Sequence, residues 1–146
     1  EELDLASFVK TTGGKGLHVV VPLQRAHTWD EAKGFSRAIA DHLARAIPER
    51  FLANMSKHKR KGKIFIDYLR NSRGATAVAA YSTRARPNAP ISVPLAWKEL
   101  SVDMRSDHFT LKNITERLGR LRQDPWKAYF TTKQRITKIM VRRLSP

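Results

Sequence analysis

Apolar residues recur every three to four positions between Thr28 and Pro48, which is the spacing of one face of an α-helix. They are Ala32, Phe35, Ile39, Leu43 and Ala46. Thr28 is followed three residues later by Glu31, which is the pattern of a capping box, and Pro48 prevents the helix from continuing. The pattern therefore predicts one amphipathic helix over this stretch.

Short segments rich in β-forming residues predict strands on both sides of this helix. Residues 7–10 and 17–21 are predicted as two strands joined by the glycine-rich turn TTGGKG, residues 11–16. After the helix, residues 64–68 are short and apolar, so we expect a buried strand that carries one acid, Asp67. Residues 81–85 are a further candidate strand, and the Pro and Asn content of residues 86–90 predicts a turn.

The rest of the chain predicts two more helices. Residues 94–100 suit a short helix with Pro94 in its first turn. In the tail, Ile136, Ile139, Met140 and Leu144 alternate with Lys and Arg, which predicts an amphipathic basic helix. Since no repeat or linker interrupts the chain, we expect a single domain over residues 1–146. Its fold class is α+β, with a mixed or antiparallel sheet flanked by helices.

The chain is strongly basic, and this charge gives information about its binding partner. Lys and Arg number 28 against 13 Asp and Glu, a net charge of +15 over 146 residues. Such an excess predicts an anionic partner, nucleic acid first and a membrane surface second. The sequence has no apolar run of about 18 residues and no signal peptide, which argues against a membrane. The absence of cysteine excludes disulfides and fits a reducing cytoplasm.

The glycine-rich turn is the first candidate for chemistry. Glycines permit positive φ and close backbone approach, so successive amides could form an anion-binding nest. Thr12, Lys15 and His18 would add donors around it. The spacing is not that of a P-loop. The alternative is an ordinary hairpin turn with Lys15 in solvent.

Asp67 and the basic stretch before it are the second candidate. A carboxylate inside an apolar strand is costly unless it is paired or bound to metal, so Asp67 is either a ligand of Mg²⁺ or Mn²⁺ or a partner of Arg70. One carboxylate cannot hold two metals, and Glu2-Leu3-Asp4 is the only acid-x-acid triplet. The preceding stretch is either a solvated loop or an edge that contacts phosphates. Its cations are Lys57, Lys59, Arg60, Lys61 and Lys63.

Three ordered blocks of sequence carry a family resemblance. They are FVKTTGGKGLH (residues 8–18), SKHKRKGKIFIDYLRN (residues 56–71), and RGAT with YSTRARP (residues 73–76 and 81–87). Together they resemble the polymerase domain of bacterial DNA ligase D, a member of the archaeo-eukaryotic primase group. The resemblance covers the chain from about residue 5 to Trp126. It implies a primase-polymerase-like fold and a DNA-repair nucleotidyltransferase of non-homologous end joining that uses two divalent metals, Mn²⁺ or Mg²⁺.

The resemblance also implies roles and partners. Thr12, Lys15 and His18 would hold the triphosphate of an incoming nucleotide, Asp67 would be a catalytic metal ligand, and Arg70 and Arg84 would surround the metal and triphosphate. The basic stretch at residues 57–63 would contact nucleic acid. Implied partners are DNA ends, a nucleoside triphosphate, the Ku protein and a ligase domain, in a nucleoid-associated bacterial protein.

The sequence departs from the family pattern in one respect. The family has an Asp-x-Asp metal pair upstream of the strand that begins near Phe8, and Glu2 and Asp4 are poor substitutes for it. We therefore expect the C-terminal half of a polymerase domain, which binds nucleotide and DNA but extends primers poorly alone. The alternatives are a non-catalytic nucleic-acid-binding module, a half-site partner of another polypeptide, and a basic RNA-binding protein. An exposed strand edge could also pair two copies.

Overall fold

The computed structural model describes residues 2–145, and the chain folds into two compact units. One unit, called here the hairpin unit, comprises residues 4–22 and 78–134. The other, the helix unit, comprises residues 23–77 together with the two chain ends, up to Leu3 and from Arg135 onward. Each unit is therefore built from segments that are far apart in the sequence. The expectation of a single domain stays a prediction.

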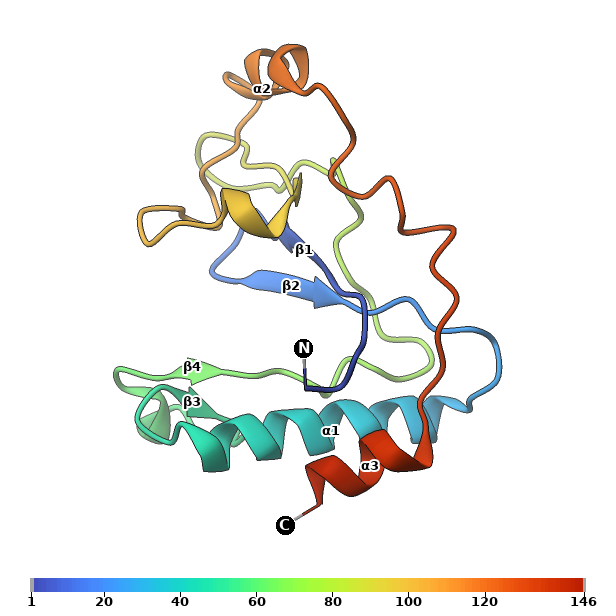
Figure 1. Ribbon diagram of the computed structural model, residues 1–146. Coiled ribbons are helices and arrows are strands. Elements are labelled where there is room, and N and C mark those ends of the chain that lie inside the picture. The colour runs from blue at the N-terminus through green and yellow to red at the C-terminus, as the bar shows by residue number, and fades with distance from the viewer. Residues whose placement is uncertain (1, 146) are drawn as a thin grey trace. The chain divides into compact units, whose positions relative to one another are not determined.

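The hairpin unit contains a three-stranded antiparallel sheet (Figure 1). Its strands are β1 (Phe8–Thr11), β2 (Leu17–Val20) and β5 (Pro94–Leu95), in the order β2-β1-β5. Lys10 pairs with His18 on one side and with Pro94 on the other. The predicted hairpin is thus confirmed to within one residue at each strand end.

The core of the hairpin unit lies along β1 and the segment that leads into β5. Its buried apolar residues are Val9, Ile91, Val93, Leu95 and Phe109. The fully buried Thr11 hydroxyl donates to the Ile91 carbonyl at 3.1 Å and accepts from the Val93 amide at 2.8 Å. These bonds satisfy a polar group that would otherwise be costly to bury.

Two predictions in this unit are wrong in part. Residues 81–85 form no strand, because Tyr81 has φ +61°, outside the β region, and only Thr83 makes an isolated bridge, to Ile91. Residues 94–100 are not one helix: Pro94 belongs to β5, and only Trp97–Glu99 form a short 3₁₀ turn. Proline can occupy an edge strand because its missing amide is not needed there. The turn at residues 86–90 is confirmed by the bond from the Ala89 amide to the Arg86 carbonyl, 2.9 Å.

A helix that the sequence did not predict, α2 (Ile114–Arg120), is held by an ion pair. The Arg117 guanidinium donates to both Glu99 carboxylate oxygens, at 2.5 and 3.2 Å, and to the Pro94 carbonyl at 3.0 Å. It also lies over the Phe109 ring, 4.8 Å from its centre. Arg117 therefore links α2 to the end of the sheet.

The helix unit is built around α1 (Trp29–Ala46) (Figure 1). Its capping box forms as predicted: the Glu31 amide donates to the Thr28 hydroxyl, and the Thr28 amide donates to the Glu31 carboxylate. Phe35 and Ala40 are buried, whereas Ala46, expected on the apolar face, is exposed. The helix ends at Ala46, with Ile47 as its C-cap, directly before Pro48 as expected.

The predicted buried strand at residues 64–68 is wrong. Only Ile64–Phe65 form a strand, β4, and they pair in parallel with β3 (Phe51–Leu52). The ladder ends after the bond from the Ile66 amide to the Leu52 carbonyl, because β3 is no longer than two residues. Asp67 consequently lies beyond the sheet and is exposed.

The tail helix is confirmed over a shorter range, α3 (Lys138–Leu144), with Thr137 as its N-cap. Leu144 is buried, and its carbonyl accepts from the Arg45 guanidinium at 3.0 Å. Three helices, a three-stranded antiparallel sheet and a two-stranded parallel sheet among the described residues confirm the α+β class. No helix among residues 2–145 is long and apolar enough to cross a membrane.

Candidate functional site

The glycine-rich turn of the hairpin unit is held from both sides. Gly13 has φ +62°, and its amide donates to the Ser106 carbonyl at 2.9 Å. The Ser106 hydroxyl in turn donates to the Gly14 carbonyl at 2.6 Å. The Thr12 hydroxyl donates to the Gly16 carbonyl at 2.6 Å and accepts from the Gly14 amide at 3.1 Å. The turn thus has a defined shape before any ligand binds.

These bonds correct the expectation of an amide nest. The amides of Gly13 and Gly14 already donate within the protein, so they do not point together at an external anion. The Thr12 hydroxyl is likewise engaged across the turn. Anion binding at this turn would have to come from its exposed tip, Lys15 and Gly16, and from side chains of neighbouring segments.

Arginine side chains supply those neighbours. The Arg84 guanidinium donates to the Thr12 carbonyl at 3.3 Å. Its Cγ lies 2.9 Å from where a Cβ of residue 13 would stand, so only glycine permits this approach. The Arg86 Nη1 also approaches the turn, 3.3 Å from the position that a Cβ of residue 14 would take. With Lys15, these arginines place three cations around one turn.

The segment that braces the turn carries its own ion pair. Arg105 Nε lies 3.1 Å from Asp107 Oδ1. The hydrogen bond from Arg105 holds the pKa of the Asp107 carboxyl below its usual range, and the charge of Arg86 acts in the same direction. The ionised Asp107 therefore orients the Arg105 side chain on the segment that carries Ser106.

His18 lies on β2, directly opposite Lys10 of β1, and is partly buried. Because opposite residues of an antiparallel pair leave the sheet on the same face, the two side chains are neighbours. Lys10 is 5% exposed, and its ammonium donates to the Val78 carbonyl. Burial lowers the pKa of the Lys10 ammonium. The predicted triphosphate residues of this unit thus lie at one end of the hairpin, with Lys10 beside His18.

Asp67 and Arg70 lie in the helix unit. One Asp67 carboxylate oxygen accepts from the Leu69 amide at 3.0 Å, which closes an Asx turn. The other lies 3.9 Å from Arg70 Nε, and both side chains are well exposed. The high cost of a buried acid, on which the metal prediction depended, does not apply at this position.

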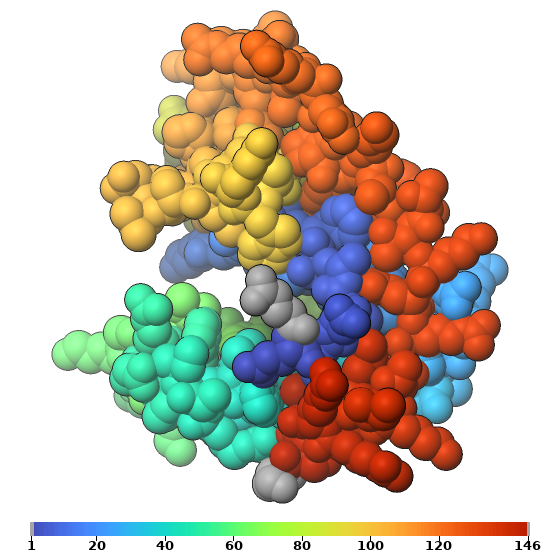
Figure 2. Space-filling view, viewed as in Figure 1, coloured from blue at the N-terminus to red at the C-terminus, as the bar shows by residue number. Residues whose placement is uncertain are grey.

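The basic stretch at residues 57–63 divides into one anchored and four exposed cations. Arg60 donates to the Met55 carbonyl at 2.7 Å and lies 4.0 Å over the Phe65 ring. Arg60 thus holds the loop, with a 3₁₀ turn at His58–Arg60. Residues 57–63 lie at the surface of this unit (Figure 2). The exposed cations of this stretch are Lys57, Lys59, Lys61 and Lys63.

A metal centre is not formed by these residues. Within residues 2–145, no three His, Asp or Glu side chains lie close enough together to hold a metal ion. A Mg²⁺ or Mn²⁺ pair needs several carboxylate oxygens that bridge both ions. Asp67 offers one carboxylate, already bonded to its own turn. Glu2, one of the weak substitutes, lies 3.6 Å from His42 instead. The described side chains therefore do not fit a two-metal site.

Three residues around the turn were not predicted from the sequence: Ser106, Arg86 and Lys10. Ser106 is about ninety positions from the turn it braces, and no local pattern shows that contact. Lys10 could have been noticed, because it stands between Val9 and Thr11 inside a predicted strand.

Comparison with known proteins gives a consistent result. The family model of the LigD primase-polymerase domain matches residues 1–126. The chain is 52% identical over 145 residues to the multifunctional non-homologous end joining protein LigD of Pseudomonas aeruginosa, covering 99% of this chain and 17% of that protein. It is 34% identical over 117 residues to the protein of the same name from Mycolicibacterium smegmatis, covering 80% of this chain and 15% of the relative.

A solved structure is similar as well. The polymerase domain from Mycobacterium tuberculosis Ligase D, in complex with DNA, superposes with a TM-score of 0.74 and 31% identity. The match covers 82% of this chain and 41% of that domain. The chain thus spans less than half of the solved domain and 15 to 17% of these two full-length relatives.

Proposed function

Because the chain belongs to the LigD primase-polymerase domain family, we propose that it acts in DNA repair by binding a nucleoside triphosphate and a DNA end. The binding of a nucleoside triphosphate is supported by one observation, the glycine-rich turn with Lys15, Arg84 and Arg86 around it. The solved relative was determined in complex with DNA, which supports the DNA part.

In this proposal the hairpin unit binds the triphosphate. Arg84 uses one donor on the Thr12 carbonyl, and a guanidinium has five, so donors remain for phosphate oxygens. Lys15 adds a cation at the exposed tip of the turn, and His18 of β2 is proposed to lie near the same phosphates. Thr12 keeps the turn in shape through the bond to Gly16, and its role toward phosphate is indirect.

The helix unit carries the other predicted site residues, Asp67 and Arg70. It also carries the exposed lysines of residues 57–63, which would contact DNA. Lysines spaced along a loop suit the phosphate backbone, because each neutralised phosphate releases counterions without reading sequence. Asp67 is a single carboxylate, and we assign no catalytic step to it. The described residues offer no metal centre. We therefore favour a binding role, or half of a site that another polypeptide completes, over primer extension by this chain alone.

Titration of ATP in the presence of Mn²⁺ tests the nucleotide site. Arg84→Gln and His18→Ala should each weaken binding about 10- to 100-fold, the usual effect of losing a charge-assisted hydrogen bond. Lys112→Ala, which removes an exposed cation elsewhere in the same unit, should bind like wild type. Unchanged affinity in both site variants would show that the site is wrongly assigned.

Salt dependence tests the DNA contacts. In a plot of log affinity against log salt, Lys59→Gln and Lys61→Gln should each reduce the slope by about one. A primer-extension assay with Mn²⁺ tests the absence of catalysis, and robust extension would contradict it. Ku, a ligase domain and a second copy paired through a strand edge remain proposed partners, to be tested by co-sedimentation with each.

A further inference from the structure

A row of aromatic rings lies on the hairpin unit, away from the glycine-rich turn in sequence. Trp126 and Tyr129 stack with ring centres 5.0 Å apart and an interplanar angle of 23°. Phe8 meets both rings edge-on, at 5.8 and 5.4 Å. Phe130 continues the row from Tyr129, at 5.0 Å. Phe130 is 92% exposed, which is unusual for so large an apolar residue.

The segment that carries these rings is fixed to the first strand. The Trp126 indole donates to the Val9 carbonyl at 3.0 Å. The Gln134 side chain makes two bonds to the backbone of Ala6, at 3.0 and 2.8 Å. The Trp126 amide donates to the Asp124 carboxylate at 2.8 Å. The segment that carries the row is thus anchored to the first strand on both sides of Tyr129 and Phe130, which limits the ordering needed when a ligand binds.

Trp97 extends the aromatic surface along the same strand. Its indole donates to the Ser7 carbonyl at 2.8 Å. Ser7 and Val9 are two residues apart, so their carbonyls point the same way at a separation of roughly 7 Å. Trp97 and Trp126 therefore donate to carbonyls on the same edge of the chain, one just before β1 and one within it. Trp97 is accessible to a ligand, because it is 49% exposed.

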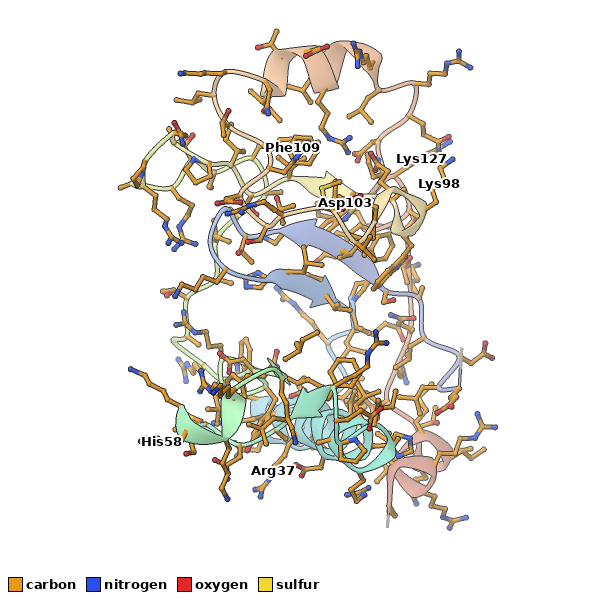
Figure 3. The ribbon with its side chains drawn as sticks, turned by 90° about the vertical axis from the view of Figure 1, so that its left-hand side faces the viewer. Arg37, His58, Lys98, Asp103, Phe109 and Lys127 are labelled. Carbon is orange, nitrogen blue, oxygen red and sulfur yellow. The ribbon has the colours of Figure 1, made fainter. Side chains whose placement is uncertain are left out.

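The charge around these rings is positive. Lys98 and Lys127 follow Trp97 and Trp126 directly in the sequence, and Figure 3 shows both lysines at the same side of the unit. Lys133 is exposed in the same segment. Of two nearby acids, Glu99 is paired with Arg117, whereas Asp124 accepts the Trp126 amide and keeps its charge. The three lysines outnumber this one unpaired acid.

We propose that this aromatic surface, formed by Trp97, Trp126, Tyr129 and Phe130, binds unpaired bases of single-stranded nucleic acid by stacking. Aromatic rings beside lysines are the combination that single-strand-binding proteins use, with rings for the bases and cations for the backbone. The family match ends at residue 126, so it assigns no role to Lys127, Tyr129 or Phe130. The proposal adds a contact with bases to the proposed DNA binding, and it does not depend on the nucleotide site.

Tryptophan fluorescence gives a direct test. The chain has three tryptophans, and Trp29→Phe leaves only Trp97 and Trp126 as reporters. A short single-stranded oligothymidine should quench them, and a blunt duplex of equal length should quench them less. In this background Phe130→Ala should weaken oligothymidine binding about 5- to 150-fold, the range measured for loss of one base-stacking ring. Equal affinity of Phe130→Ala and its parent would overturn the proposal.

Control variants separate stacking from other causes. Phe130→Tyr keeps a ring and should bind like the parent, whereas Phe130→Leu keeps an apolar side chain without a π face and should bind like Phe130→Ala. Leu111→Ala, at an exposed apolar position of the same unit, should have no effect. Full binding by Phe130→Leu would contradict stacking. Because Phe130 is 92% exposed, removal of its ring leaves the core intact.

Two further measurements distinguish other outcomes. If the surface instead pairs two copies of the chain, sedimentation will show a concentration-dependent dimer that Phe130→Ala abolishes, and oligothymidine will not quench the tryptophan fluorescence. That result would overturn the proposal.

Arg84→Gln should leave quenching by oligothymidine unchanged while it weakens ATP binding. Loss of quenching in Arg84→Gln would contradict a separate surface, whereas normal quenching without any ATP binding would count against the nucleotide site alone.

Discussion

Gly13 is the position in the glycine-rich turn where a single methyl group should have the largest effect. Its φ of +62° lies in the left-handed region, where an alanine is strained by about 1–2 kcal/mol. A Cβ at this residue would also stand 3.1 Å from the Pro90 carbonyl oxygen and 2.9 Å from Arg84 Cγ. The Arg84 side chain can move, but the Pro90 carbonyl is fixed by the Arg84 amide, at 2.8 Å.

Overpacking against such fixed backbone typically costs about 1–3 kcal/mol. The two terms together predict that Gly13→Ala lowers the free energy of unfolding by roughly 2–5 kcal/mol. Gly16 is the matched control in the same turn, since a Cβ there meets nothing within 4 Å and its φ is not in the left-handed region. Gly16→Ala should be neutral or stabilising by up to about 1 kcal/mol, through the unfolded chain.

Urea unfolding followed by circular dichroism measures both variants. The same samples, titrated with ATP, should show weaker binding by Gly13→Ala, because the methyl group displaces Arg84 from the turn. Free energies of unfolding within about 0.5 kcal/mol of each other for the two variants would refute the strain and contact argument, since ordinary surface substitutions differ by no more than this.

Three further predictions concern polar groups inside the hairpin unit, and urea unfolding tests each. Thr11→Val should cost about 1–3 kcal/mol, because two buried backbone groups lose the hydroxyl that satisfies them. Arg117→Leu should cost a similar roughly 1–3 kcal/mol by leaving Glu99 unpaired, and adding Glu99→Leu should recover part of the loss. Burial lowers the pKa of the Lys10 ammonium from its usual 10.5, so the unfolded chain binds more protons in the alkaline range below that value. The stability of wild type should therefore rise relative to Lys10→Met as the pH approaches 10.5, and a constant difference would contradict this sign.

Local patterns predicted the elements that depend on local interactions. The capping box of Thr28 and Glu31 and the stop at Pro48 fixed α1 closely, because both act within one turn of the helix. The β1–β2 hairpin followed from its glycine-rich turn, which joins adjacent segments. The α+β class followed from these elements together.

Elements that depend on distant partners were predicted poorly. The strand at residues 64–68 has the right composition, but its length is set by β3, which offers only two residues for pairing. The local preference of Pro94 predicted a helix, but Pro94 pairs with β1 as part of the edge strand β5. In the site, residue types near the turn were identified from sequence, whereas the hydrogen bonds that use the amides of Gly13 and Gly14 depend on Ser106 and on turn geometry.

The interleaving of the two units has a consequence for synthesis on the ribosome. The bonds between Ala6 and Gln134 span 128 residues, and that between Trp126 and Val9 spans 117. The helix unit is also closed late, since Arg143 donates to the Glu2 carbonyl. Contacts of such separation slow folding, because the intervening loop must be closed first. During synthesis β1 therefore stays incompletely covered until Trp126 and Gln134 have emerged.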